Sequence, residues 1–319
     1  MKKQLLIAAV AATMTSVAMA DVSISGAAQV NWTNTDTTGA DSVNAISHDF
    51  DLKITGKSGD TKVVMDIENT DAGAEQASGS STNSQEMNVK NAYMATSIAG
   101  VNVKIGTWYG SDSLTSNGTQ KEDQVSLDYS MNGVKVQYEN HAAGDESITV
   151  SGEISGVKLS HEMFQNDNTE TKVSGSFAGV NAAYLTVDSD TTNSKKDSLE
   201  VSTEVQGVTL TYAEVSVDGT GTTTSDAWFG TFDNDATNSD VIHEASGFGA
   251  SMALAGNTVT VKSYDVKEAS THADDSYTKF VVNRPLASGA TLEVTYTDKD
   301  AGDARADVET LDIELAVKF

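Results

Sequence analysis

Apolar and polar side chains alternate, residue by residue, along most of this chain. In the last nine residues every second position is apolar: Leu311, Ile313, Leu315, Val317 and Phe319. Successive side chains of a β-strand point to opposite faces, so this period of two predicts a strand with one apolar and one polar face. The same period recurs from Val22 onward and never changes to a helical one. The pattern therefore predicts an all-β protein.

Short turns that contain glycine separate many of these strands. They are Ser58–Asp60, Ala99–Val101, Asn132–Val134, Ser155–Val157, Ala178–Val180, Gln206–Val208, Ala255–Asn257 and Ser288–Ala290. Glycine supplies the positive φ angle that a tight hairpin turn needs. Eight such turns at one rim, with a free strand at each end of the chain, imply nine hairpins and 18 strands.

The connections between these hairpins are longer and polar. They comprise 33–45, 70–86, 109–124, 188–197, 216–242, 267–274 and 298–307, with shorter ones at 141–145 and 165–170. Short periplasmic turns and long extracellular loops are typical of outer-membrane barrels. Closure also explains why the chain ends inside a strand, because the last strand must pair with the first to remove both edges. We predict a transmembrane, antiparallel, up-and-down β-barrel formed as one domain by residues 21–319.

The first 20 residues have the features of an export signal. Lys2 and Lys3 precede an apolar run from Leu5, and Ala18-Met19-Ala20 is a small-x-small cleavage site. The apolar run is too short to span a bilayer as a helix, and no other run is longer. We expect residues 1–20 to be a signal peptide that is removed during export through a Gram-negative cell envelope.

The composition excludes several classes of function. The chain carries 46 Asp and Glu against 20 Lys and Arg, a net charge of −26, which disfavours nucleic acid as a partner. It has no Cys, so it has neither disulfides nor thiolate metal sites. The histidines show no zinc-site spacing, and no nucleophile-elbow, phosphate-loop or dinucleotide motif is present. We therefore expect no enzymatic activity and no cofactor.

The polar face of the predicted strands carries too many charges for a dry core. It includes Asp49, Asp51, Lys53, Lys62, Asp66, Glu68, Lys90, Asn102, Lys104, Asp128, Lys135, Gln137 and Glu139. Burying such groups in an apolar interior is costly, so a closed wall of this size and lining must enclose water. The low apolar content of 38% is no objection, because only one residue in two of a barrel strand faces lipid. The pattern predicts a water-filled pore, and the acidic surplus predicts a preference for cations.

Three pieces of the chain resemble general diffusion porins of Gram-negative bacteria. Asn91–Gly110 is similar to a strand, turn, strand and loop start of that family, Val22–Gly26 resembles its first strand, and Phe319 matches its terminal aromatic residue. The resemblance implies that Leu315, Val317 and Phe319 form a closing strand that the barrel-assembly machinery reads, and that the protein is a homotrimer. The chain departs from the family in having Thr107 where an Arg is usual. Family barrels of this size commonly have 16 strands, which is the alternative to our count of 18.

The resemblance also implies a constriction. The loop 109–124 would fold into the barrel and bring Asp112, Lys121, Glu122 and Asp123 into the pore. Opposite it would lie a basic wall of lysines on the inward phase of the early strands: Lys53, Lys62, Lys90 and Lys104. A transverse field between loop and wall would orient small polar solutes. The alternative is that these lysines only neutralise neighbouring acids.

The predicted function is an outer-membrane pore for passive diffusion of small hydrophilic solutes and ions. One alternative is a substrate-selective channel, which the count of 18 strands favours. Aromatic residues along the lumen would support it, but we find only Trp108 on the inward phase. We place Tyr264 and Tyr296 in an aromatic girdle at the outer membrane boundary. Another is a secreted, acidic, β-rich surface or filament protein, which leaves the alternating loop lengths unexplained. Loop acids such as Asp71 and Glu75 either hold Ca²⁺ or Mg²⁺ that bridges lipopolysaccharide or are simply solvated.

Overall fold

The structure is a computed structural model that describes residues 21–71, 85–109, 121–141, 146–165, 167–190, 194–219, 242–268, 275–302 and 306–319. These residues form 18 strands: β1 (Asp21–Thr37), β2 (Val43–Ser58), β3 (Thr61–Asp71), β4 (Gln85–Ile98), β5 (Val101–Tyr109), β6 (Lys121–Met131), β7 (Val134–His141), β8 (Glu146–Ile154), β9 (Val157–Phe164), β10 (Thr169–Phe177), β11 (Val180–Ser189), β12 (Ser194–Val205), β13 (Val208–Gly219), β14 (Ile242–Leu254), β15 (Asn257–Glu268), β16 (Asp275–Pro285), β17 (Ala290–Asp300) and β18 (Val308–Lys318). The described part of the chain contains no helix long and apolar enough to cross a membrane.

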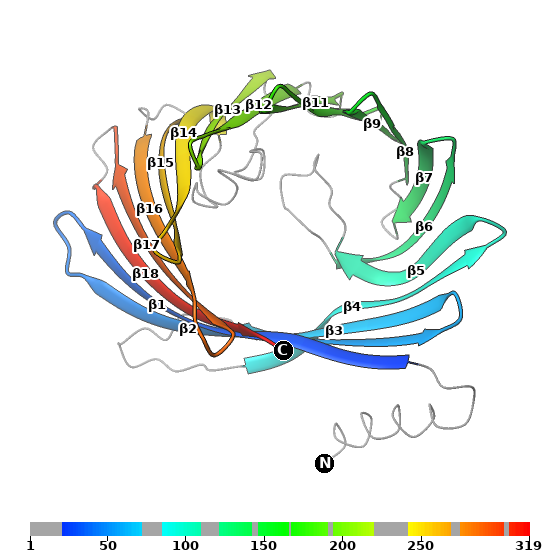
Figure 1. Ribbon diagram of the computed structural model, residues 1–319, viewed down its shortest axis with the longest axis horizontal. Coiled ribbons are helices and arrows are strands. Elements are labelled where there is room, and N and C mark those ends of the chain that lie inside the picture. Colours follow the sequence, from blue (N-terminus) through cyan, green and yellow to red (C-terminus); the bar gives the residue numbers. More distant parts are fainter. Residues whose placement is uncertain are drawn as a thin grey trace, which may run out of the picture.

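The strands form one closed antiparallel sheet. Each strand pairs with the next along the chain, and β1 also pairs with β18, so the wall surrounds a central space (Figure 1). At the seam Leu315 lies opposite Val30 and Val317 lies opposite Ala28. The seam ends in two backbone hydrogen bonds between Gly26 and Phe319, of 2.8 and 3.0 Å. The predicted count of 18 strands is confirmed, and the alternative of 16 is wrong.

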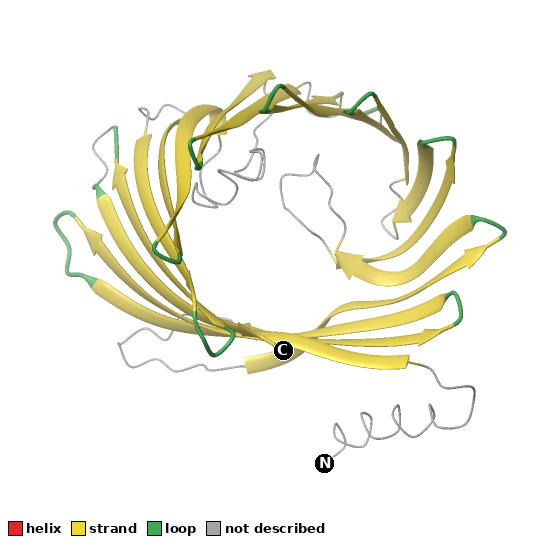
Figure 2. Cartoon of the chain, in the orientation of Figure 1, coloured by secondary structure: helices red, strands yellow, loops and turns green. Residues whose placement is uncertain are grey.

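The short turns have the geometry that hairpins favour. At six of them a residue with φ between 51° and 53° precedes a glycine with φ between 79° and 85°, as in Ala99-Gly100. Two successive positive φ angles define a type I′ turn, whose twist matches that of the strands it joins. Figure 2 shows these turns as short green connections between neighbouring strands. The glycines picked out in the sequence therefore mark the true hairpins.

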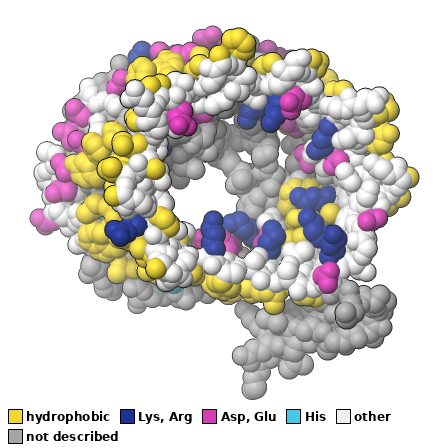
Figure 3. Space-filling view, viewed as in Figure 1, with side chains coloured by type: hydrophobic (Ala, Val, Ile, Leu, Met, Phe, Trp, Pro, Cys, Tyr) yellow, Lys and Arg dark blue, Asp and Glu magenta, His cyan; other side chains and the backbone are white. Residues whose placement is uncertain are grey.

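The register preserves the two faces of the wall from strand to strand. Lys53 of β2 lies opposite Asp66 of β3, which lies opposite Asn91 of β4. Basic and acidic side chains border the central opening, and the register identifies the basic ones as lysines, whereas hydrophobic side chains lie along much of the outer side of the wall (Figure 3). Ile24 and Phe248 on this outer face are 63% and 67% exposed. Such exposure is expected of side chains that contact lipid, so the outer face is the membrane-facing one.

One part of the inner face departs from the predicted polar lining. A cluster of nearly unexposed apolar side chains lies on the inward phase of β13–β16: Ala213, Val215, Ala245, Tyr264, Val266 and Tyr277. Tyr264 and Tyr277 are opposite each other, and their rings stack 4.8 Å apart. The wall is thus charged on β2–β10 and partly apolar on β13–β16.

Candidate pore lining

The register brings three of the four predicted wall lysines onto one inner surface. Lys62 of β3 lies opposite Ala95 of β4, which lies opposite Lys104 of β5. Lys53 of β2 is on the same face, across from Asp66. These side chains come from neighbouring strands, so the basic wall predicted from the sequence is a continuous surface.

The fourth lysine reaches the inner face through a β-bulge. The register between β3 and β4 shifts so that Asp66 pairs with Asn91 while Ile67 pairs with Val89, which leaves Lys90 as the extra residue. A bulge of this kind re-aims a side chain without changing the faces of the strand on either side. Lys90 Nζ lies 2.9 Å from Glu68 Oε2 on the inner face.

Two of the four lysines are neutralised by neighbouring acids. Lys53 Nζ lies 3.6 Å from Asp66 Oδ2, and Lys90 Nζ contacts Glu68 and lies 3.9 Å from Asp51 Oδ1. The inner-face contact between Lys135 of β7 and Asp128 of β6 is of the same kind, at 3.9 Å. For Lys53 and Lys90 the geometry fits the reading in which wall lysines neutralise nearby acids.

Lys62 and Lys104 have aromatic partners instead. Lys104 Nζ lies 3.8 Å from the ring centroid of Trp108 and 4.3 Å from that of Tyr93. Lys62 Nζ lies 5.7 Å from the same Tyr93 ring. Neither ammonium group forms an ion pair with any residue that the structure describes. The wall therefore contains two charges that rings stabilise but do not neutralise.

The predicted constriction loop lies mostly outside the described residues. Asp112 falls there, as do the side chains of Lys121 and Glu122, whose backbones belong to β6. Asp123 lies opposite Thr107, whose hydroxyl donates a hydrogen bond to its carboxylate. Both residues share the phase of Val125 and Ile105, which is that of the outer face. The inward folding of 109–124 stays a prediction.

The opposite charge gathers on β17 and β18. Glu293 lies across from Glu314 on the inner face, and Asp312 is two residues before Glu314. Asn283 and Thr33 donate hydrogen bonds to Glu293 and Asp312. None of these three carboxylates forms an ion pair within the described part of the chain. They form an acidic strip that is separate from the lysines of β3–β5.

A model of the family described as Gram-negative porins matches residues 7–316. The chain belongs to the Gram-negative porin family. Its wall is accordingly that of an outer-membrane channel for small solutes, and it is not an enzyme. A comparison with curated protein sequences finds no match.

Solved structures of outer-membrane barrels share the porin's fold. OccK11 (OpdR) of Pseudomonas aeruginosa has a TM-score of 0.69 at 10% identity, and the match covers 94% of this chain and 96% of OccK11. OpdK with vanillate, also from Pseudomonas aeruginosa, has a TM-score of 0.69 at 9% identity, and the match covers 94% of this chain and 98% of OpdK. OccAB4 of Acinetobacter baumannii gives 0.69 at 10% identity, with 94% and 98% covered. At such low identity these likenesses show the fold alone.

The inner face of the porin holds more aromatic residues than predicted. Tyr93 accompanies Trp108 on β4 and β5, while Tyr264 and Tyr277 stack on the inner face of β15 and β16. Phe164 lies opposite the inner-face Ser147. The prediction that Trp108 is the only inward aromatic residue is therefore wrong, as is the placement of Tyr264 in the girdle. The phase set by Val259 and Val261, both on the outer face, already assigns Tyr264 to the lumen.

The outer face of the porin changes from apolar to polar along the strands. Tyr184, Tyr212 and Tyr296 each donate a hydrogen bond to a carboxylate, those of Asp197, Glu214 and Glu309. An aromatic ring with its hydroxyl turned to polar groups suits the membrane boundary. Tyr296 thus lies on the outer face as predicted.

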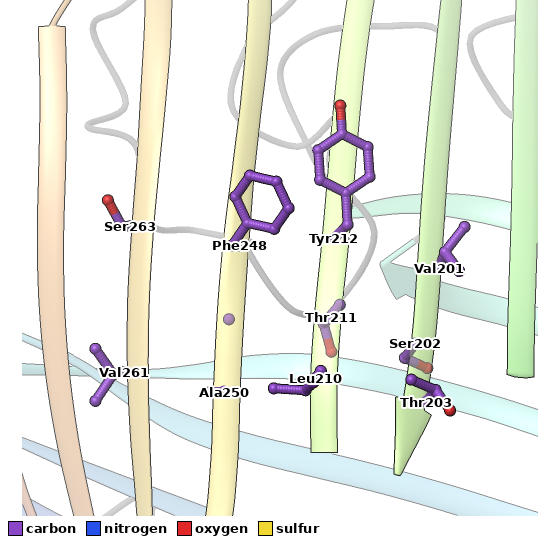
Figure 4. Close-up of a pocket in the computed structure, with 11 residues that line it drawn as sticks. Val201, Ser202, Thr203, Leu210, Thr211, Tyr212, Phe248, Ala250, Val261 and Ser263 are labelled. Carbon is purple, nitrogen blue, oxygen red and sulfur yellow. The ribbon is translucent and has the colours of Figure 1, made fainter. Parts of the chain in front are cut away.

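The outer face also has a hollow between β12 and β15. It measures about 520 Å³ and is lined mainly by Val201, Leu210, Tyr212, Phe248, Ala250 and Val261. Figure 4 shows the rings of Tyr212 and Phe248 side by side above the small Ala250, and their centroids are 4.9 Å apart. This hollow faces lipid and is separate from the pore.

Proposed function

We propose that this porin lets small hydrophilic solutes and ions diffuse passively through its barrel. The observation that carries the proposal is a closed wall whose inner face bears charged side chains on many strands, such as Lys53, Glu139 and Glu314. Charged groups in such numbers require water, and water around them provides a path for hydrated solutes.

The proposal includes a modest cation preference. The acidic strip on β17 and β18 supports it, because its carboxylates face the lumen without ion-pair partners among the described residues. Lysines on the inner face oppose it: Lys53, Lys57, Lys62, Lys90, Lys104, Lys135, Lys158, Lys172, Lys196, Lys262, Lys279, Lys299 and Lys318. Some of the net charge of −26 has no bearing on a solute in the pore, because Asp197, Glu214 and Glu309 lie on the outer face.

Recordings from the purified protein in a planar lipid bilayer test both parts. The expected result is stepwise conductance in KCl, with a reversal potential in a salt gradient whose sign indicates cation preference. An absence of steps would refute the pore. A reversal potential of the opposite sign would refute the cation preference and leave the pore intact.

A substrate-selective channel is the second candidate, and the inner aromatic residues favour it. Tyr93 and Trp108 lie beside Lys104, so one wall presents both apolar surface and positive charge. The structure of OpdK with vanillate shows a barrel of this fold together with an aromatic carboxylate. Liposome swelling separates the two functions. Passive diffusion predicts rates that fall smoothly with solute size, whereas selectivity predicts one chemical class that enters faster than its size allows.

We propose the same assembly route that the family resemblance implies. Residues 1–20 are removed as a signal peptide, the barrel-assembly machinery folds the chain, and three copies associate in the outer membrane in contact with lipopolysaccharide. Mass spectrometry of the purified protein tests the first step, with an N-terminus at Asp21 expected. The mass of the detergent-solubilised particle tests the third.

A further inference from the structure

Lys104 is held in place by the wall itself. Its ammonium group lies against two rings, with Trp108 on its own strand β5 and Tyr93 on the neighbouring strand β4. The two rings meet edge to face, 6.1 Å apart and at 71°. Trp108 is only 6% exposed, so it is itself fixed by packing. A lysine side chain ordinarily loses much rotational freedom when it binds a ligand, and here that freedom is already restricted.

Gly106 makes this arrangement possible. It lies opposite Tyr93 with φ of 143°, and a Cβ there would come within 2.6 Å of Tyr93 Cα and 2.3 Å of the Ala92 carbonyl oxygen. No other residue type allows the two strands to approach so closely at this point. The backbone of β5 is therefore shaped to bring the Tyr93 ring over Lys104.

Lys62 completes a group of two positive charges around one ring. Its Nζ and that of Lys104 lie 5.7 and 4.3 Å from the Tyr93 centroid, so the two ammonium groups are at most about 10 Å apart. Lys62 is exposed and Lys104 half-buried, so both can be reached from the lumen. Lys104 of β5 lies opposite Ser126 of β6, which lies opposite Glu139 of β7. Glu139 forms no ion pair with Lys104.

We propose that Lys62, Tyr93 and Lys104 form a binding subsite for small oxyanions on the pore wall. The proposal rests on the proposed function, because the subsite is reached through the water-filled lumen. Each ammonium group offers hydrogen-bond donors to a carboxylate or phosphate oxygen, and charge-assisted bonds of this kind are the strong ones. Tyr93 and Trp108 act as positioning residues that hold Lys104 without neutralising it. A solute with a carboxylate or phosphate group then pauses at this wall, although the pore as a whole prefers cations.

Block of single-channel current by added anions tests the subsite. Inorganic phosphate in one arm and succinate in the other are titrated into KCl at constant ionic strength, and saturable block of the wild-type current by either is expected. Block by both shows recognition of the shared oxyanion chemistry, and block by one identifies the preferred class. Steady conductance that neither anion reduces would overturn the subsite while the pore stands, whereas a lack of any conductance would instead refute the proposed function.

Two matched pairs of variants separate binding at this site from a general effect of charge. Lys104→Gln should weaken the block about tenfold or more, while Lys158→Gln, which also removes one inner-face lysine without a described ion pair, should leave it within about twofold. Equal losses in both variants would contradict the proposal. Tyr93→Leu keeps every charge and should still weaken the block, whereas Tyr93→Phe keeps the ring and should not. If Tyr93→Leu assembles and blocks like the wild type, the ring has no positioning role.

Discussion

At the scale of the single residue, the seam of the barrel depends on a missing side chain. A Cβ at Gly26 would lie 2.6 Å from the Asp51 carbonyl oxygen and 2.6 Å from Phe319 Cζ. The Phe319 ring occupies the space above this glycine and stacks on Phe50, with 6.4 Å between centroids. The terminal aromatic residue is therefore packed into the joint between the first and last strands as well as ending the chain.

Gly26→Ala should loosen this joint. The added methyl group must displace either a ring or a backbone carbonyl, which typically costs about 1–3 kcal/mol. Thermal unfolding of the detergent-solubilised barrel should show a lower midpoint than that of the wild type. Gly152→Ala is the control, because its Cβ would meet the Gly133 carbonyl oxygen at a milder 3.2 Å. Equal midpoints for Gly26→Ala and the wild type would show that Phe319 moves aside freely.

The sequence pattern does not predict the face or the partners of some single residues. The face of Tyr93 is ambiguous, because Ala92, Tyr93 and Met94 are all compatible with lipid and only the pairing of Tyr93 with Gly106 settles its phase. The division of the lysines into paired and ring-bound groups was likewise unpredictable. It depends on which side chain lies across the strand, and the periodicity of one strand contains no information about its neighbour's register.

At the scale of the element, the bulge in β4 reconciles two phases of the same strand. Strict alternation of faces from the outward Val89 places Lys90 in the lumen, whereas strict alternation back from the outward Ala92 places it against lipid. Only an extra residue satisfies both. The short turns are different, because each needs positive φ and so leaves a glycine in the sequence. Hairpins could therefore be predicted from the sequence, and the bulge could not.

Deletion of Lys90 should be tolerated. Without it Val89 and Asn91 become neighbours that already point outward and inward, so regular alternation is restored. Deletion of Val103 from the middle of β5 should instead send one half of that strand to the wrong face. The measurement is the amount of heat-resistant barrel in outer-membrane fractions, with near wild-type levels expected for the first variant and a severe loss for the second. Loss of both would show that the Lys90 contacts with Glu68 and Asp51 are required for assembly.

At the scale of the whole molecule, charge matters by the face on which it lies. The inner acidic strip and the outer-face carboxylates contribute equally to the net charge of −26 but not to the field inside the pore. Bulk solvent and counter-ions screen charges that are separated by more than about 10 Å at 0.1 M salt. Composition alone therefore gives the net charge, whereas the ion preference depends on which charged side chains face the lumen.

Neutralising the strip provides a direct measurement. The double variant Glu293→Gln, Glu314→Gln should shift the reversal potential in a KCl gradient toward zero, because two lumen carboxylates are lost. Two outer-face changes, Asp197→Asn and Glu214→Gln, alter the net charge by the same amount and should leave the reversal potential unchanged. The shift should also shrink as salt concentration rises. Equal effects from both pairs would mean that the outer carboxylates influence the pore at long range.

The pairing of β1 with β18 makes the wall a ring, and a ring has no intrinsic first strand. A short linker could join Phe319 back to the start of β1, with new termini opened at a two-residue turn such as Ser155-Gly156. The finished wall would keep every neighbour, but the ribosome would make its strands in a different order. In that circular permutant Phe319 would still pack over Gly26 without being the last residue. The contribution of its packing to stability could then be measured apart from its role as a C-terminal signal for the assembly machinery.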